Sequence, residues 1–225
     1  MGLFRKLANV VYPPKCIFCR RLLDHDVALN ICNSCYVKLP FAEETLLTTS
    51  FKGDENYCDG AISVFQYTGV VKESLIRFKF YNMPSYFRTY ARLIAHRLAK
   101  ITDIKQYDMV MSVPLHKQKE FSRGYNQAYL ISRVLSSELK LPECSRLLKR
   151  SRQTDSQSLL DKHKRHKNVQ GAFVTTPTDK LKGKSILLVD DILTTGSTIE
   201  ECCRILKQAG ALKATAVVVA SGRKY

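Results

Sequence analysis

Two neighbouring aspartates, Asp190 and Asp191, stand between an apolar run and a turn that is rich in hydroxyl groups. The run, residues 185–189, has the unbroken apolar character of a buried parallel strand. The turn, residues 194–198, opens an amphipathic helix pattern that stops at Gly210. A strand, a polar loop and a helix in this order predict a ligand site at the C-terminal end of the strand.

The residue types of this stretch indicate which ligand would fit. The turn Thr194, Thr195, Gly196, Ser197 and Thr198 offers backbone N–H groups and hydroxyls at a helix N-terminus, which suits a phosphate. Carboxylates beside a phosphate make sense when they accept hydrogen bonds from a polyol or face a metal. A ribose 5-phosphate meets this description. The alternative is a crossover in which the acids and hydroxyls merely cap the helix, and the whole constellation favours the ligand site.

Four cysteines form a second chemical pattern, Cys16-x-x-Cys19 followed after twelve residues by Cys32-x-x-Cys35. Two such pairs can bring four thiolates together in a tetrahedron around a structural metal ion. Zinc is favoured because nothing else in the sequence indicates electron transfer, although iron of the rubredoxin type takes the same ligands. The module could contact nucleic acid or protein, or it could simply stabilise the main domain.

The elements that must position these groups follow from the apolar patterns. They predict strands over residues 61–67 (with an alternating pattern), 108–116, 185–189 and 214–220, and helices over 70–80, 84–100 and from 117–127 through 139. Strands that alternate with helices predict an α/β fold with a mostly parallel sheet. We therefore expect a cysteine module in residues 1–50 and an α/β domain in residues 51–225.

The charge of the chain indicates polyanionic partners. Its 225 residues carry a formal net charge of +16, and basic residues concentrate between Arg146 and Asn168. Such an excess suits nucleic acid, anionic lipid or polyphosphate substrates. No apolar run approaches the roughly 18 residues of a membrane span. Residues 1–14 have the pattern of a short amphipathic helix rather than a secretory signal, so we expect a cytoplasmic protein.

The segment from Val189 to Thr198 resembles the phosphoribosyl pyrophosphate (PRPP) signature of type I phosphoribosyltransferases. The resemblance implies that Asp190 and Asp191 hold the ribose hydroxyls and act in catalysis, while the turn at 194–198 holds the 5′-phosphate. It also implies a pyrophosphate loop after the first core strand, here Leu115, His116 and Lys117, and Mg²⁺ bound together with PRPP.

Further motifs resemble the ComF/GntX family, whose members join a four-cysteine zinc motif to a phosphoribosyltransferase domain. The matching stretches are Val113–His116, Ser122–Ala128, Arg152–Gln157 and Asn168–Phe173, and the resemblance covers essentially the whole chain. It implies a five-stranded sheet and a basic loop that closes over PRPP, with Arg152 and Arg165 in catalysis. The same loop could lie along a nucleic-acid backbone, through Arg150, Arg152, Lys162, Lys164, Arg165 and Lys167.

The resemblance implies a role in natural transformation, in which ComF proteins act on incoming single-stranded DNA. The expected partners are PRPP or a related ribose phosphate, single-stranded DNA and proteins of the DNA-uptake machinery. Two other functions stay open at this point. One is an active transferase that acts on a base or amine acceptor, and the other is a regulator that responds to PRPP.

Overall fold

A computed structural model describes residues 13–24, 27–43, 56–152 and 168–223 of the chain. Its centre is a four-stranded sheet in which every pairing is parallel, in the order β1-β6-β5-β2. The strands are β1 (Gly60–Gln66), β2 (Met109–Ser112), β5 (Ser185–Leu193) and β6 (Lys213–Ser221), and β3 (Leu148–Arg150) pairs antiparallel with β4 (Phe173–Thr175). The helices are α2 (Asn33–Tyr36), α3 (Gly69–Phe80), α4 (Tyr86–Ile101), α5 (Lys117–Arg123), α6 (Gln127–Leu139) and α8 (Ser197–Gln208).

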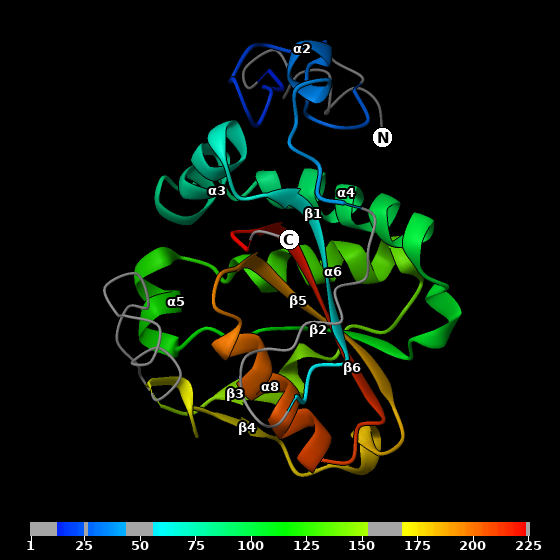
Figure 1. Cartoon of the computed structure of the whole chain (residues 1–225). Helices are drawn as coiled ribbons and strands as arrows, with labels where there is room; N and C mark the ends of the chain where they lie inside the picture. Colours follow the sequence, from blue (N-terminus) through cyan, green and yellow to red (C-terminus); the bar gives the residue numbers. More distant parts are fainter. Residues whose placement is uncertain (1–12, 25–26, 44–55, 153–167, 224–225) are drawn as a thin grey trace, which may run out of the picture.

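Strand β5 shows how the sheet divides the core into two layers. Leu187 and Val189 pack into the cluster formed with α4 and α6, whereas Ile186 and Leu188 pack into the cluster formed with α8 and β4. Figure 1 shows α4 and α6 on one side of the sheet, and α8 with the β3-β4 ribbon on the other. Because both faces are covered, residues 186–189 of the strand form an unbroken apolar run, as the sequence predicted.

The α/β fold with a parallel sheet is confirmed, and several details differ from the sequence predictions. Strand β5 runs on to Leu193 because its last residues pair with β6, so the two aspartates lie within the strand and not after it. Strand β1 does not alternate, since its first six residues are buried. The family resemblance implied a five-stranded sheet, whereas the main sheet of the described residues has four strands.

The single helix predicted to run to Leu139 is wrong, because the chain breaks between α5 and α6. Gly124 ends α5 with φ of 84°, a left-handed conformation that glycine adopts without strain. Asn126 then starts α6, since its side chain accepts a hydrogen bond from the Tyr129 N–H.

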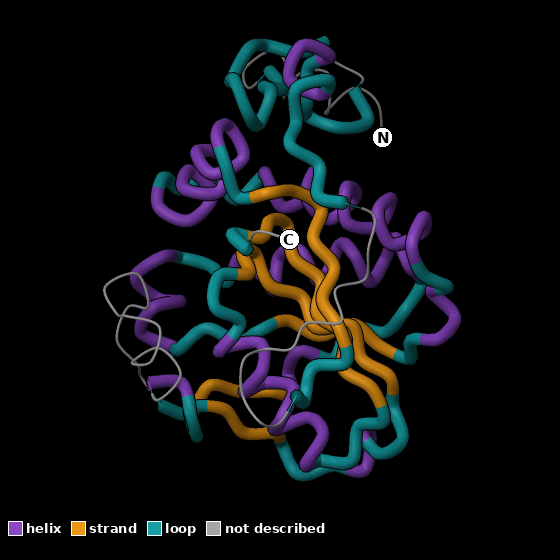
Figure 2. Tube along the Cα trace, viewed as in Figure 1, coloured by secondary structure: helices purple, strands orange, loops and turns teal. Residues whose placement is uncertain are grey.

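The cysteine module lies over α3 and α4, and Figure 2 shows that it consists mostly of loops. Arg77 on α3 donates hydrogen bonds to the carbonyls of Ile17 and Phe18, at 3.0 and 2.7 Å. The Ser74 hydroxyl donates to the Ile17 carbonyl at 2.8 Å, and the Phe18 ring meets Phe65 of β1 edge to face. The module therefore shares one apolar core with the larger domain.

Two sequence predictions fall outside the described residues. The expected division at residue 50 lies in 44–55, and the expected amphipathic helix lies mostly in 1–12. Both remain predictions. Among the helices of the described ranges, none combines the length and apolar character that crossing a bilayer requires.

Candidate functional site

A cavity of about 430 Å³ opens at the C-terminal end of β5. Its floor comes from β5 and the start of α8, through Asp190, Asp191, Thr194, Gly196 and Thr198. Its walls come from the segments after β1 and β2, from α3 and α5, and from the end of β3; they include Tyr67, Ile76, Lys79, Phe80, Val113, Pro114, Leu115, Lys119, Arg123 and Arg150. The predicted ribose acids and part of the predicted phosphate turn thus share one cavity.

The two acids differ in how their charge is balanced. Asp191 is 7% exposed and forms an ion pair with Lys79 of α3, with 2.9 Å between oxygen and nitrogen. The Asp190 carboxylate accepts a hydrogen bond from the Asp191 N–H at 2.8 Å. Burial and the neighbouring charge of Asp191 raise the pKa of Asp190 to about 7, although Lys79 acts in the opposite direction. Asp190 is therefore ready to take or lose a proton near neutral pH.

The turn after β5 is held in place by Arg223, the last residue that the structure describes. The Arg223 guanidinium donates hydrogen bonds to the carbonyls of Thr194 (3.2 Å) and Thr195. Gly196, with φ of 84°, sits at the N-cap of α8. This fixes the turn at a helix N-terminus, where partial positive charge favours a phosphate.

The five predicted turn residues do not all face the cavity. Thr194, Gly196 and Thr198 line it, whereas the hydroxyls of Thr195 and Ser197 lie 3.1 Å from each other. The supporting role of Arg223 was missed, because nothing in a sequence places a residue after β6 beneath the turn after β5. Parallel pairing of the two strands brings them together.

The predicted pyrophosphate loop is divided between the cavity and a helix cap. Leu115 lines the cavity, but His116 caps α5 by accepting a hydrogen bond from the Gln118 N–H at 3.4 Å. His116 and Lys117 are outside the described cavity lining, and their pyrophosphate role stays a prediction. Two cations of α5, Lys119 and Arg123, do line the cavity. Their spacing of four residues on one helix face was the signal that sequence reasoning overlooked.

The C-terminal end of α3 is tied to the segment between α5 and α6. The Tyr125 hydroxyl donates to the Phe78 carbonyl at 2.5 Å, and the Gln127 amide donates to the same carbonyl at 3.4 Å. The Tyr125 ring also stacks on Phe78, with 5.9 Å between centroids. These contacts give a physical role to the Ser-Arg-Gly-Tyr-Asn-Gln motif, because they hold the last turn of α3, and with it Lys79, against the cavity.

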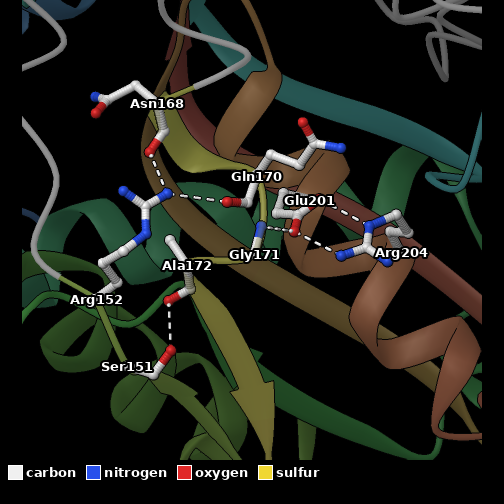
Figure 3. A network of polar contacts seen from close by, with 8 residues as sticks. All are labelled: Ser151, Arg152, Asn168, Gln170, Gly171, Ala172, Glu201 and Arg204. Atoms are coloured by element: carbon white, nitrogen blue, oxygen red, sulfur yellow. Dashed lines mark hydrogen bonds and ion pairs between the residues drawn. The ribbon is translucent and has the colours of Figure 1, made fainter.

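Figure 3 shows the contacts on either side of residues 153–167, which lie outside the described residues. The Arg152 guanidinium donates to the carbonyls of Asn168 and Gln170, at 3.1 and 2.9 Å, so it joins the chain before that segment to the chain after it. The Gly171 N–H donates to Glu201 at 2.7 Å, and Arg204 forms two hydrogen bonds with the same carboxylate. Both ends of the segment are thereby fixed to the domain.

The predicted loop residues are only partly placed by the structure. Arg150 lines the cavity, and its guanidinium lies 5.2 Å from the centroid of the Phe173 ring. Arg152 is outside the described lining. The remaining predicted loop cations lie outside the described residues: Lys162, Lys164, Arg165 and Lys167. Their roles, and that of Arg152 in catalysis, remain predictions.

The four predicted metal ligands, Cys16, Cys19, Cys32 and Cys35, come together. Their sulfur atoms all lie within 4.8 Å of one another, and those of Cys19 and Cys32 are 3.6 Å apart. Four sulfurs bonded to one zinc ion would lie about 3.8 Å apart, given Zn–S bonds of about 2.3 Å. Arg20 makes the first turn possible by adopting a left-handed conformation, and its N–H bonds back to the Cys16 carbonyl at 2.8 Å. The cluster could therefore hold a metal ion.

The raised pKa of Asp190 predicts how stability depends on pH. The folded state favours the protonated acid, so the carboxylate costs stability once pH rises above its unfolded value near 4, and the full cost is reached above about 7. We expect Asp190→Asn to raise the free energy of unfolding at about pH 8, by on the order of 2 kcal/mol, and to leave it nearly unchanged at about pH 4.5. Urea unfolding at both pH values measures this difference.

Asp108→Asn is the matched control, and its expected effect on the free energy of unfolding has the opposite sign. The backbone N–H of Ser185, followed by Lys184, lowers the pKa of Asp108, so its charged form stabilises the fold. Asp108→Asn should therefore lower stability to a similar extent at about pH 8 and at about pH 4.5, with an effect that fades only as the pH falls below about 4. Equal pH profiles for the two variants would contradict the electrostatic description of Asp190.

Known proteins resemble this chain along most of its length. The family described as the phosphoribosyl transferase domain matches residues 123–225. Competence protein F from Haemophilus influenzae is 31% identical over 211 residues, which cover 87% of this chain and 92% of that protein. Competence protein ComFC from Bacillus subtilis is 29% identical over 148 residues, covering 66% of this chain and 58% of its own. DNA utilization protein YhgH from Escherichia coli strain K12 is 34% identical over 113 residues, covering 50% of this chain and 48% of its own.

The match to competence protein F covers 87% of this chain, and the phosphoribosyl transferase domain match contains the acids and the turn at the floor of the cavity. The mostly parallel sheet corresponds to the type I phosphoribosyltransferase fold. The chain therefore belongs to the ComF family, with a four-cysteine cluster ahead of a phosphoribosyltransferase domain.

Proposed function

We propose that this protein binds PRPP together with Mg²⁺ in the cavity at the end of β5. The observation that carries the proposal is the single cavity that contains the acid pair and the N-terminus of α8. In this pose Asp190 and Asp191 accept hydrogen bonds from the ribose hydroxyls, and the turn at residues 194–198 takes the 5′-phosphate. The diphosphate then lies towards Leu115 and the cations of α5.

Magnesium fits the chemistry of this site. The floor offers carboxylate and hydroxyl oxygens, which are the donors that a hard cation prefers. When bound with PRPP, the ion would screen the charge of the diphosphate. The residues of the chain then supply the remaining balance, since Lys79, Lys119, Arg123 and Arg150 all line the cavity. Transfer of the phosphoribosyl group to a base or amine acceptor is the catalytic use that this site would serve, with Arg152 and Arg165 assisting.

Asp191→Asn tests the binding proposal. The substitution removes an anionic acceptor for the ribose diol, so we expect the affinity for PRPP with Mg²⁺ to fall at least about tenfold. Isothermal titration calorimetry measures the affinity, and thermal unfolding checks that the variant is folded. Asp179→Asn is the matched control, because Asp179 is an exposed acid whose partner is Lys182. Affinity unchanged by Asp191→Asn would remove this assignment of the acid pair.

A second proposed role is the handling of single-stranded DNA in natural transformation, on the cytoplasmic side of the DNA-uptake machinery. It is supported by relatives that are named as competence and DNA utilization proteins, and by the formal net charge of +16. A chain with this excess of cations can neutralise several phosphates of a strand.

Salt dependence tests this role. We expect a labelled oligothymidine of about 20 nucleotides to bind at about 50 mM salt, and the logarithm of affinity to fall with that of the salt concentration by about 0.7 for each phosphate neutralised. Fluorescence anisotropy across a salt series measures the slope. Absence of binding at low salt, or binding that ignores salt, would contradict a role based on charge.

The four-cysteine cluster is proposed to hold a structural zinc ion. Elemental analysis of the purified protein should find about one zinc per chain, and Cys19→Ser should lose it. Since the module shares a core with α3 and α4, the same variant should lower the thermal midpoint by about 5 °C or more. Cys144→Ser is the control, because Cys144 lies outside the cluster. Recovery of iron in place of zinc would overturn the metal assignment.

A further inference from the structure

The last residue of α3, Phe80, is an aromatic side chain in an unusual position. Phe80 lines the cavity together with Lys79 and Asp191, and 68% of the residue is nevertheless exposed. The apolar residues of α3 that serve the core, including Val71, Leu75 and Phe78, are fully buried. Phe80 therefore contributes little to the core and presents a planar apolar surface to the cavity.

This ring already has one cationic neighbour. The Arg123 guanidinium of α5 lies 5.4 Å from the ring centroid, a distance at which cation and ring attract each other. Arg123 is oriented in turn by the Gln127 side chain, which accepts a hydrogen bond from the guanidinium at 2.7 Å. The guanidinium lies over one side of the ring, and the residue as a whole nevertheless stays 68% exposed.

The backbone beneath the ring is held in place. Tyr125 and Gln127 both donate to the carbonyl of Phe78, two residues before Phe80. A side chain on a fixed helix end loses less conformational freedom on binding than one on an unrestrained loop. The position is thus prepared for a ligand rather than formed by it.

The charges around the ring favour a ligand that joins a planar group to phosphate. The described lining contains four cations, and its acids are Asp190 and Asp191 on the floor. Nucleobases stack on aromatic side chains whatever their sequence, and the adjoining phosphates seek such cations. The ring also borders the same cavity as the proposed ribose and phosphate groups, so base and sugar could be recognised side by side.

We propose that Phe80 and Arg123 form a stacking site for an unpaired nucleobase at the mouth of the cavity. The base stacks on the ring, and Arg123 and Lys119 face its phosphate. This inference rests on the proposed function, because it names the part of a single strand that reaches the PRPP cavity. A free nucleotide has the same chemistry, and the experiment separates the two sources.

The test compares four variants by fluorescence anisotropy with labelled oligothymidine, and by calorimetry with thymidine 5′-monophosphate. Phe80→Ala should weaken oligonucleotide binding at least about fivefold, the loss expected for one stacked base. Phe80→Leu should weaken it similarly despite keeping apolar area, whereas Phe80→Tyr should retain binding. Phe121→Ala is the matched control and should leave binding unchanged, because Phe121 is 91% exposed on α5 but outside the described cavity lining.

Each outcome decides the matter. Loss of oligonucleotide affinity in Phe80→Ala but not in Phe121→Ala supports the site, with a strand as its source. Loss confined to the mononucleotide supports the same site with a free nucleotide as its source. Equal affinities in Phe80→Ala and the unmodified protein for both probes would overturn it. A parallel PRPP titration of the unmodified protein and of Phe121→Ala keeps the two proposals separate, since absence of PRPP binding in the unmodified protein would remove the proposed function alone.

Discussion

The ion pair between Lys79 and Asp191 joins α3 to the strand at the floor of the cavity. A buried carboxylate at the end of a central strand is costly unless an opposite charge meets it, and here that charge comes from α3. The same helix carries Ser74 and Arg77, which bond to the cysteine module, and its last turn is held by Tyr125. Helix α3 therefore connects the floor of the cavity, its wall and the N-terminal module.

This linkage affects how the cavity can be used. Burial and the charge of Asp191 raise the pKa of Asp190 to about 7 although Lys79 lowers it, so the charge of Asp190 responds to what binds beside it. A ribose diol would favour the ionised form, because it donates hydrogen bonds to a carboxylate. The cations of α5 and β3 line the same cavity. The proposed binding of a ribose polyphosphate there does not depend on whether transfer follows.

The motifs differ in how much of their role can be predicted from the sequence. The acid pair and the turn at residues 194–198 are adjacent in sequence, so their common place at one strand end could be predicted locally. The four cysteines have ligand spacing, which is also a local signal. Phe80 and Arg223 have no such spacing. Each lies near the end of a helix or strand, and only the packing of separate elements brings Phe80 to the cavity and Arg223 to the carbonyls of the turn after β5.

The sequence by itself determined the α/β class, the polar turn after β5, the acid pair and the cysteine cluster, because periodic burial and ligand spacing act over a few residues. The tertiary structure alone decided how far β5 extends, since its last residues form a strand only by pairing with β6. It also decided that a helix preceding the matched domain supplies Lys79 and Phe80 to the cavity. The carboxyl ends of parallel strands lie at the same edge of a sheet, whatever the order of the strands in the chain. Residues that are far apart in the sequence therefore meet at that edge, and no local sequence pattern shows that they do.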